Sequence, residues 1–351
     1  MRDLIDVVSC NVVMIPGVGN VILDCGEGSN ALLKRHFAGA QYEEFIKGLR
    51  TLYVSHLHAD HHLGVLGVLK EYTKLQQSLP SDQRQPLFLI GPWRLFSSIY
   101  EYNQVENIGL DEYIIPFSSY NLIPQDFMTS NNIPQNLDIG LFQGFLSTMN
   151  FRAFETCFVP HCPHAYGVAM THKSGWKIVY SGDCRPSGDL VEIGRDATVC
   201  IHEATVAESQ PQEALEKMHC TTGEAIMIGK RMNAKHILLT HFSQKWCKIP
   251  EFVVDWSKHK EEGDKYKNVG IAFDHMRVKI GEMWKLPLMY SAYEVMYGDE
   301  RTRNTWFKAN NAREESKNAK RGLEEKVEPP PKRVHLQVAE PESLATTGAE
   351  Q

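Results

Sequence analysis

The sequence predicts a mixed α/β protein whose strands fall into two sets, as in a four-layer αββα sandwich in which two sheets stack between outer helices. Two observations support this fold class. Apolar runs typical of strands occur in an early group and again in a late group, with helical spacing between them. The 351 residues are 42% hydrophobic, which is enough for a substantial core.

The first third of the chain reads as a hairpin followed by alternating helices and strands. Apolar runs at 7–14 and 20–25 flank a Pro16-Gly17 turn, which indicates a β-hairpin. Further elements are then expected in this order: helices at 31–37 and 42–49, a strand at 51–55, a helix at 62–77, a strand at 86–91 and a helix at 93–102.

From 103 to 144 prolines interrupt the chain and no period persists, so no element is predicted there. The later pattern predicts strands at 151–159, 166–172, 176–181, 197–201 and 235–240 and a helix at 221–232. Thr221 or Thr222 could cap that helix.

Beyond about Asp299 the chain has few large apolar residues, many charges and a run of three prolines before Lys332-Arg333. Such a segment cannot bury enough apolar surface to offset the entropy of ordering it. The sequence therefore predicts a folded domain at 1–298 and a disordered, charged tail at 299–351. The basic pairs Lys320-Arg321 and Lys332-Arg333 fit a nuclear-import signal or a solvated tail without an address.

Cysteine usage and charge exclude several classes of protein. The eight cysteines form no Cys-x-x-Cys pair, no signal peptide is evident, and no apolar run reaches the ~18 residues that span a membrane. A reduced, intracellular protein outside the membrane is expected. The net charge is −6, and residues 301–351 hold ten basic and eight acidic side chains, so the first 300 residues carry −8. Nucleic acid would therefore have to be held locally or by a partner surface.

Potential metal ligands follow the strand expected at 51–55. The run LYVSHLHADHHLG, residues 52–64, contains His56, His58, Asp60 and His61. In an extended segment His56 and His58 lie on one side and can share an ion, and the Asp-His pair can bind a second ion at the turn into the next helix. Imidazole and carboxylate ligands suit catalytic Zn²⁺, with Mn²⁺ or Fe as alternatives.

Three later strand ends supply further candidate ligands, because His161, Asp183 and His241 each follow an apolar run. Asp183 is the natural bridging carboxylate between two ions. Glu203 ends another strand, and His219 precedes the helix expected at 221–232. A carboxylate that orients an imidazole produces a general acid for an alkoxide leaving group.

These motifs resemble a known family. The HxHxDH run is similar to the signature of the metallo-β-lactamase superfamily, which implies an αββα sandwich with two metal ions at one edge. The runs SGD at 181–183, HEAT at 202–205, HCT at 219–221 and HFSQ at 241–244 resemble tRNase Z, the endonuclease that removes the 3′ trailer of precursor tRNA. The resemblance covers roughly residues 8–290, includes DCGEG at 24–28 and AFDHM at 272–276, and is to the C-terminal, catalytic half of the long eukaryotic form.

The resemblance implies a two-zinc site and roles for its residues. One zinc would be held by His56, His58 and His161, and the other by Asp60, His61 and His241, with Asp183 and a hydroxide bridging them. Asp60 would also act as general base, and His219, held by Glu203, would protonate the departing 3′ oxygen. Residues near the scissile phosphate would be Gly26, Glu27, Gly28, Ser29, Phe242 and Ser243.

The resemblance also implies partners, and the basic pairs of the tail bear on the location. Precursor tRNA is the expected substrate, and an N-terminal half or another substrate-binding protein is an expected partner. A nuclear location is expected, with a mitochondrial one as the alternative.

The sequence departs from the family pattern in three places. The family's opening strand and its PxKxRN loop should precede residue 8, where only residues 1–7 stand, so a truncated start is expected. The tRNA-gripping arm of the short forms is absent, because only 22 residues separate His161 from Asp183. The usual HST and SQRY read His219-Cys220-Thr221 and Ser243-Gln244-Lys245-Trp246; Lys245 keeps the charge of an arginine but not its forked donor.

Two alternatives to a precursor-tRNA endonuclease remain. One is another hydrolase of the same fold, acting on esters, thioesters or other phosphodiesters. The other is a metal-binding catalytic half with weak activity that works only with a separate N-terminal half. The HEAT and HFSQ runs count against the first, and the intact ligand set counts against the second.

Overall fold

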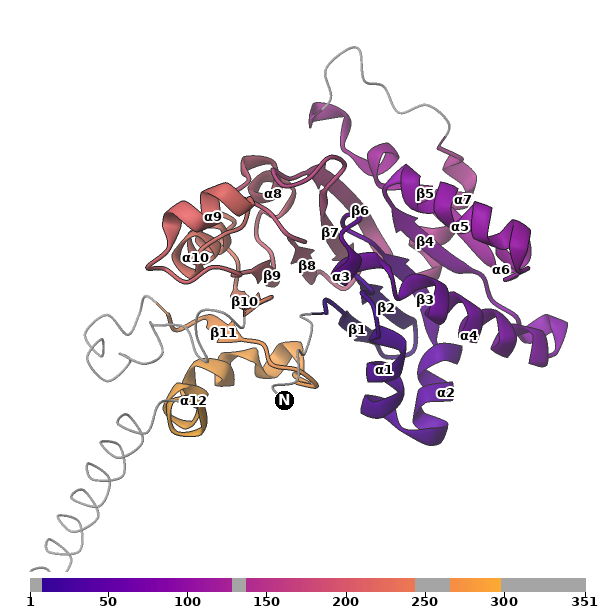
Figure 1. Cartoon of the computed structure of the whole chain (residues 1–351), viewed down its shortest axis with the longest axis horizontal. Coiled ribbons are helices and arrows are strands. Elements are labelled where there is room, and N and C mark those ends of the chain that lie inside the picture. The colour runs from indigo at the N-terminus through magenta and orange to yellow at the C-terminus, as the bar shows by residue number, and fades with distance from the viewer. Residues whose placement is uncertain (1–7, 128–136, 244–265, 298–351) are drawn as a thin grey trace, which may run out of the picture. The chain divides into compact units, whose positions relative to one another are not determined.

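The computed structural model describes residues 8–127, 137–243 and 266–297, which belong to one unit, Met1–Gly298. The tail expected at 299–351 and the residues Gln244, Lys245 and Trp246 lie outside this part of the chain, as do residues 1–7. The described strands form a five-stranded sheet of order β1-β2-β3-β4-β5 and a six-stranded sheet of order β11-β10-β9-β8-β7-β6 (Figure 1).

The first sheet consists of β1 (Asn11–Ile15), β2 (Gly19–Leu23), β3 (Leu49–Tyr53), β4 (Leu87–Gly91) and β5 (Ile114–Ser118). Strands β1 and β2 form the expected antiparallel hairpin, and β2 to β5 are parallel. The second sheet consists of β6 (Phe151–Phe158), β7 (Tyr166–His172), β8 (Lys177–Tyr180), β9 (Val199–Glu203), β10 (His236–Thr240) and β11 (Val269–Ile271). Strand β7 is antiparallel to both β6 and β8, whereas β8 to β11 are parallel.

The helices that precede or follow strands of the first sheet are α1 (Ser29–Phe37), α2 (Gly39–Lys47), α3 (Ala59–His62), α4 (Val65–Ser78), α5 (Trp93–Val105) and α6 (Leu110–Tyr113). The later helices are α7 (Ile139–Thr148), α8 (Gly188–Ile193), α9 (Pro211–Lys217), α10 (Thr222–Arg231) and α12 (Tyr290–Tyr297). The 3₁₀ segments are η1 (Ser81–Gln83), η2 (Ser119–Leu122), η3 (Gln125–Phe127) and η5 (Ile280–Met289).

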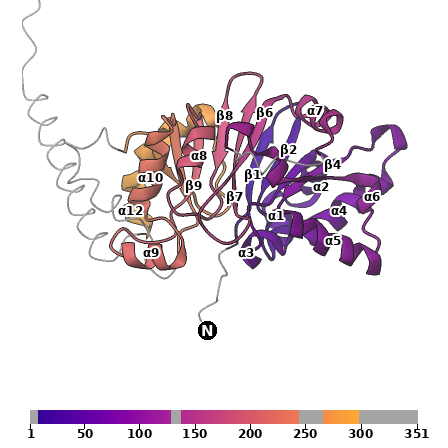
Figure 2. The same ribbon diagram turned by 90° about the horizontal axis from the view of Figure 1, so that it is seen from above.

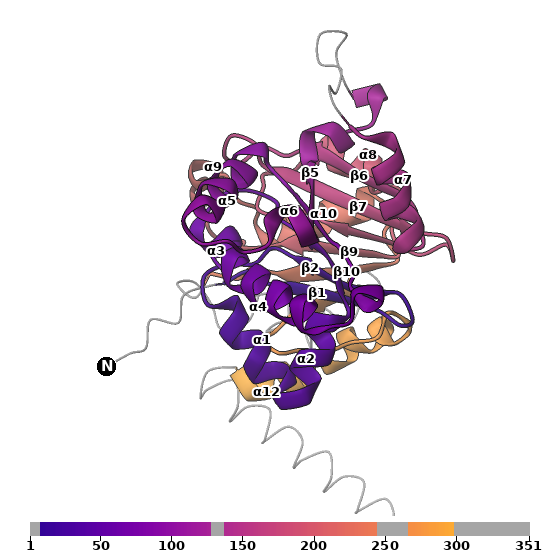
Figure 3. The same ribbon diagram turned by 90° about the vertical axis from the view of Figure 1, so that its right-hand side faces the viewer.

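Three buried clusters define four layers, because side chains alternate along each strand. In β3, Leu52 packs with the helices α1, α2, α4 and α5, while its neighbour Tyr53 packs between the two sheets. In β8, Tyr180 also lies between the sheets, and Val179 packs toward α8 and α10. Figure 2 shows α4 and α5 on one side of the paired sheets and α10 on the other, and Figure 3 views the α4–α6 side. The predicted αββα sandwich is confirmed.

Several boundaries and elements differ from the sequence-based expectations. The strand expected at 51–55 ends at Tyr53, and the helix expected at 62–77 is broken between α3 and α4. The break falls at Gly64, whose N–H donates to the Cys25 carbonyl oxygen at 2.9 Å. In the region without a prediction, β5 contains Pro116, which is tolerated because β5 is an edge strand. The elements α8, α9, β11, η5 and α12 were not expected.

Of the two threonines expected as possible caps of α10, Thr221 is the cap. Its hydroxyl accepts from the N–H of Glu224, and the Glu224 carboxylate accepts from the Thr221 N–H, which completes a capping box. This fixes the chain that leads from His219 into the helix.

Gly64 and Gly26 let the backbone of α3 approach the loop after β2 more closely than residues with a Cβ atom would allow. A Cβ on Gly64 would lie 2.1 Å from the Gly26 carbonyl oxygen, and one on Gly26 would lie 2.0 Å from the Asp60 carbonyl oxygen. Both contacts are to backbone, which cannot rotate away. This pair of glycines therefore sets the position of Asp60 and His61.

Gly64→Ala is expected to lower the free energy of unfolding by about 1–3 kcal/mol, because it overpacks a backbone contact. Gly144→Ala is the matched control, since Gly144 is exposed in α7, a Cβ there would meet nothing within 4 Å, and alanine is the better helix former. Urea unfolding of both variants measures the difference. Equal midpoints would contradict the close approach of the two backbones.

Candidate metal centre

The candidate site residues converge because they follow strands that run in the same direction within each sheet. His56 and His58 follow β3, and Asp183 and His241 follow the parallel strands β8 and β10. His161 follows β6, which runs parallel to β8 because both are antiparallel to β7. The carboxyl ends of these strands bring residues far apart in sequence to one edge of the sandwich.

The first group of donor atoms contains three histidines. The side chains of His56, His58 and His161 offer ligand atoms within 4.8 Å of one another, together with Cys162. His161 Nε2 lies 3.1 Å from His58 Nδ1, and the rings of His56 and His161 have their centroids 4.8 Å apart. The cysteine was not expected at this position.

The second group contains Asp60, His61, Asp183 and His241, whose ligand atoms also lie within 4.8 Å of one another. His61 Nε2 lies 3.3 Å from His241 Nε2 and 3.5 Å from Asp60 Oδ2. Asp60 Oδ2 is 3.4 Å from His241 Nε2. The Asp60 carboxylate is 36% exposed, which leaves it open to a reactant.

Asp183 lies between the two groups. Its Oδ2 atom is 3.1 Å from His61 Nε2, 3.8 Å from His56 Nε2 and 3.9 Å from His161 Nε2. Its Oδ1 atom is 3.6 Å from His241 Nε2. A carboxylate in this position can offer one oxygen to each group.

Hydrogen bonds orient four of the histidines with Nε2 toward the centre. His61 Nδ1–H donates to Asp24 Oδ2 at 2.7 Å, and His161 Nδ1–H donates to the Met218 carbonyl oxygen at 2.8 Å. Hydroxyl oxygens accept from the other two: Ser55 from His56 and Thr205 from His241, each at 2.9 Å. Such partners on the far ring nitrogen are typical of metal-ligating histidines.

Two buried polar atoms at the centre have no hydrogen-bond partner among the described residues, and a bound cation would give them one interaction each. His56 Nε2 and Asp183 Oδ1 are buried without a hydrogen bond among the described residues. Burial, followed by repulsion from His61, lowers the pKa of His56 to about 2, which keeps its ring neutral. The donor set therefore fits a metal ion, since buried polar groups are otherwise almost always paired.

The charges around Asp183 also favour a cation. Burial opposes ionisation of Asp183, but His241 and His61 hold its pKa well below the usual range. Burial alone would lower the pKa of His61, yet the carboxylates of Asp183 and Asp24 raise it well above the usual value. Without metal, a proton on His61 supplies the positive charge that these carboxylates require.

Glu203 and His219 form a pair beside this centre. His219 Nδ1 lies 3.0 Å from Glu203 Oε1 and 3.9 Å from Asp183 Oδ2. The Glu203 carboxylate is 1% exposed, and it also accepts from the Thr205 hydroxyl at 2.6 Å. Burial opposes ionisation, but the hydrogen bond from His219 keeps the pKa of Glu203 below its usual value. The Glu203 carboxylate thus fixes the orientation of the His219 ring through Nδ1.

Residues expected near the scissile phosphate lie in the loop after β2, at the start of α1 and directly after β10. The Gly26 N–H donates to the Ser9 carbonyl oxygen at 3.1 Å, and of the next three residues Glu27 and Gly28 are exposed whereas Ser29 is buried. Phe242 and Ser243 directly follow His241 and are half-buried.

Sequence reasoning missed Asp24, Ser55, Thr205 and Cys162. Asp24 has a left-handed φ of 61° and 0% exposure, and its two oxygens accept from the Ser55 N–H and hydroxyl as well as from His61. The signal that was available is the acid in the DCGEG run at 24–28, directly after an apolar strand.

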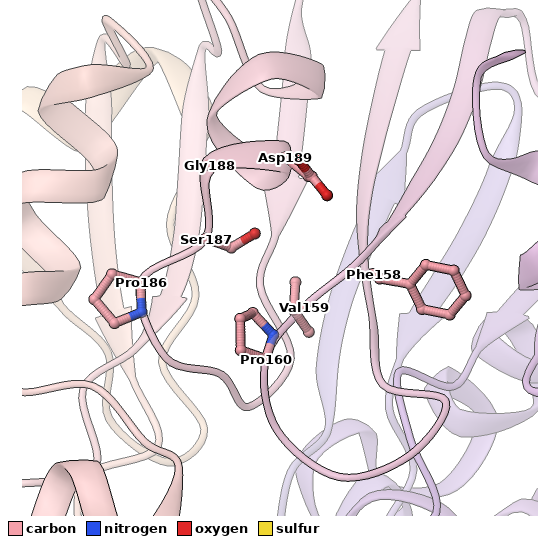
Figure 4. A pocket seen from close by; sticks show the side chains of 7 residues that line it. All are labelled: Phe158, Val159, Pro160, Pro186, Ser187, Gly188 and Asp189. Carbon is pink, nitrogen blue, oxygen red and sulfur yellow. The ribbon is translucent and has the colours of Figure 1, made fainter. Parts of the chain in front are cut away.

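A separate pocket of about 330 Å³ lies beside the centre, between the loops after β6 and β8 (Figure 4). Its walls include Pro160, which precedes His161, and Pro186, three residues after Asp183. Ser187 and Asp189 contribute its side-chain oxygens. Because Asp189 is the charged group among its lining residues, the pocket does not favour a phosphate.

A family model described as Anti-Pycsar protein Apyc1 matches residues 5–252. The chain is 39% identical over 295 residues to the Zinc phosphodiesterase ELAC protein 2 of Rattus norvegicus, covering 84% of this chain and 33% of that protein. It is 34% identical over 285 residues to the protein named Ribonuclease Z, mitochondrial, of Drosophila melanogaster, covering 80% and 33%. The chain thus spans about a third of the length of these relatives.

A solved structure of a long-form RNase Z from yeast matches with a TM-score of 0.69 and 27% identity, covering 78% of this chain and 38% of that one. The expected resemblance to tRNase Z is therefore confirmed. Together with the two donor groups, these similarities identify a metal-binding site. No helix among the described residues is long and apolar enough to cross a membrane.

Adding Zn²⁺ to the metal-free chain is expected to raise its thermal midpoint, because an ion at about 100 times its Kd stabilises the folded state by about 2.7 kcal/mol. Asp183→Asn should abolish most of this shift, since it removes the charge shared by both groups. Asp189→Asn, an exposed carboxylate outside them, should keep it. Calorimetry with and without zinc measures the shift; equal shifts in the two variants would contradict the central position of Asp183.

Proposed function

The chain belongs to the family that the Anti-Pycsar protein Apyc1 model describes, and from its similarity to proteins named ribonuclease Z we propose that it is a zinc-dependent endoribonuclease that removes the 3′ trailer of precursor tRNA. The observation that carries the proposal is the pair formed by buried Glu203 and partly exposed His219 next to the two donor groups. A metal centre alone serves many hydrolases of this fold. A carboxylate-held histidine beside it serves a reaction whose leaving group needs a proton, as a ribose 3′ oxygen does.

We propose that two zinc ions bind, one at His56, His58 and His161 and the other at Asp60, His61 and His241, with Asp183 shared. When bound, two such ions acidify a water molecule and stabilise the charge of an in-line phosphoryl displacement. Mn²⁺ or Fe would fit the same nitrogen and oxygen donors. Cys162 is an additional donor atom beside the first group.

In this mechanism the protein's own side chains move two protons. Asp60, the half-exposed carboxylate of the second group, accepts the proton of the attacking water. His219 donates a proton to the departing 3′ oxygen, while Glu203 stabilises the imidazolium through Nδ1. The tRNA then ends in a 3′-hydroxyl, and the trailer carries a 5′-phosphate. The histidine ring is 15% exposed, so a substrate can reach it whereas Glu203 stays covered.

Substrate contacts are proposed for two loops and for surfaces beyond this centre. The residues proposed to lie near the scissile phosphate are Gly26, Glu27, Gly28, Ser29, Phe242 and Ser243. The acidic charge of the first 300 residues does not favour capture of tRNA by bulk attraction. We therefore propose that an N-terminal half or another substrate-binding protein assists capture.

For the location of the protein in the cell we propose the nucleus or the mitochondrion. Support comes from the basic pairs of the C-terminal segment and from the name of the Drosophila relative. The seven cysteines in the described part of the chain are all free, as a reducing compartment requires.

Single-turnover cleavage of a precursor tRNA by the zinc-loaded chain, beside bis(p-nitrophenyl) phosphate, tests the function. Cleavage just after the discriminator base is the expected result. Turnover of the small diester without cleavage of the tRNA would mean that the centre is active but that substrate capture requires another polypeptide. Turnover of neither substrate by a chain that retains its zinc would contradict the proposal.

His219→Ala is expected to lower the single-turnover rate on precursor tRNA by about 10²–10⁴-fold, the usual contribution of a general acid. Its zinc content should stay unchanged, because His219 is assigned to the leaving group and not to an ion. His172→Ala is the matched control, since that imidazole stacks on Trp176 at the end of β7. Loss of zinc together with activity would instead make His219 a ligand of the group that it forms with His161 and Asp183.

A further inference from the structure

A second kind of metal-ligating cluster lies in the interior, directly behind the Glu203–His219 pair. The side chains of Cys184, His202 and Cys220 are each 0% exposed. One candidate ligand atom of each residue lies within 4.8 Å of those of the other two. Apolar side chains of the layer between the second sheet and α10 surround them. The proposed reaction uses none of these three groups.

His202 has the orientation of a ligating histidine. Its Nδ1 atom lies 2.7 Å from the main-chain carbonyl oxygen of Glu203, which can only accept, so Nδ1 carries the proton. Nε2 is therefore an unprotonated donor atom, and it faces Cys184 Sγ at the long distance of 4.0 Å. Burial lowers the pKa of His202, which favours the neutral ring. The histidines at the sheet edge are fixed in the same way.

The two thiols complete a charge-balanced set. Cys220 Sγ lies 3.0 Å from the Cys184 carbonyl oxygen, which can only accept, so without metal this thiol carries its proton. A divalent cation would displace the two thiol protons, and the two thiolates would cancel its charge. With a neutral imidazole the resulting complex carries no net charge, which suits an apolar interior.

We propose that Cys184, His202 and Cys220 form a third, buried site for a thiophilic divalent cation, with zinc as the expected ion. Thiolate with imidazole selects Zn²⁺ or Cd²⁺ over Mg²⁺ and Ca²⁺. Tetrahedral ligation at about 2.0–2.3 Å puts ligand atoms roughly 3.5–3.8 Å apart, so no two ligand atoms of the cluster need to approach by more than about 1.3 Å. The Cys184 carbonyl oxygen, 3.0 Å from Cys220 Sγ, would lose its S–H donor and is a candidate fourth ligand.

An ion at this site would position the general-acid pair without touching the substrate. The N–H groups of Cys184 and Cys220 both donate to Glu203 Oε1, at 2.9 and 3.1 Å. The same oxygen receives His219 Nδ1. A cation that joins the two thiolates would therefore fix the donors that orient the Glu203 carboxylate, and through it His219.

Cadmium tests the site directly, because thiolate-to-cadmium charge transfer absorbs in the ultraviolet whereas histidine and carboxylate ligation does not. The starting chain is Cys162→Ser, which removes the thiol of the first donor group at the sheet edge. On this background, Cys184→Ser/Cys220→Ser is compared with Cys157→Ser/Cys200→Ser, a pair equally buried but outside the cluster. Cd²⁺ is added to each chain, and the absorption and bound metal are measured.

The charge-transfer absorption is expected in Cys162→Ser and in the Cys157/Cys200 control. The Cys184/Cys220 variant is expected to lose this band and to bind about one fewer ion. Equal bands in the two double variants would overturn the proposal. If the Cys184/Cys220 variant fails to fold, X-ray absorption of the zinc-loaded Cys162→Ser chain decides the question. A zinc–sulfur shell near about 2.3 Å with a third bound ion supports the site, and nitrogen and oxygen neighbours alone would refute it. These measurements of metal content stand apart from cleavage of any RNA.

Discussion

The Asp24 carboxylate is the interaction on which the rest of the metal centre depends. It follows β2 of the first sheet and accepts from Ser55 and His61 on that sheet's side and from the Tyr180 hydroxyl of the second sheet at 2.7 Å. One buried charge therefore sets the ring of His61, the turn after β3 and the contact between the sheets. Charge-assisted hydrogen bonds of this kind are stronger than neutral ones, and removing the acceptor would leave several buried donors unpaired.

The same sharing of contacts extends from the metal centre to the proton donor. Thr205 accepts from His241 and donates to Glu203, so a single hydroxyl connects a candidate metal ligand to the carboxylate that holds His219. Position of the ligands and orientation of the acid are therefore not independent. A change among the candidate metal ligands would therefore alter the Glu203–His219 pair through a short chain of hydrogen bonds, and the reverse also holds.

Local patterns were sufficient to predict the sandwich and the residues brought together at its edge. Candidate ligands such as His56, Asp183 and His241 lie within three residues of the end of an apolar strand, so their placement follows from that strand. The partners that orient them could not be predicted. Asp24 meets Tyr180 only because two sheets pack face to face, and Cys184 meets His202 only because β8 and β9 are parallel neighbours in one register. β5 was missed because Pro116 argues against a strand unless its edge position is known.

Neither sheet alone holds a complete set of donor atoms, since the first contributes His56, His58, Asp60 and His61 and the second contributes His161, Asp183 and His241. The affinity for metal therefore also depends on the angle at which the two sheets pack. A substitution in the layer between them, such as one at Phe145 or Phe154, would rotate one sheet slightly against the other while both remain folded. Selection for metal binding at the edge of the sandwich would in this way also conserve the packing of the layer between the sheets.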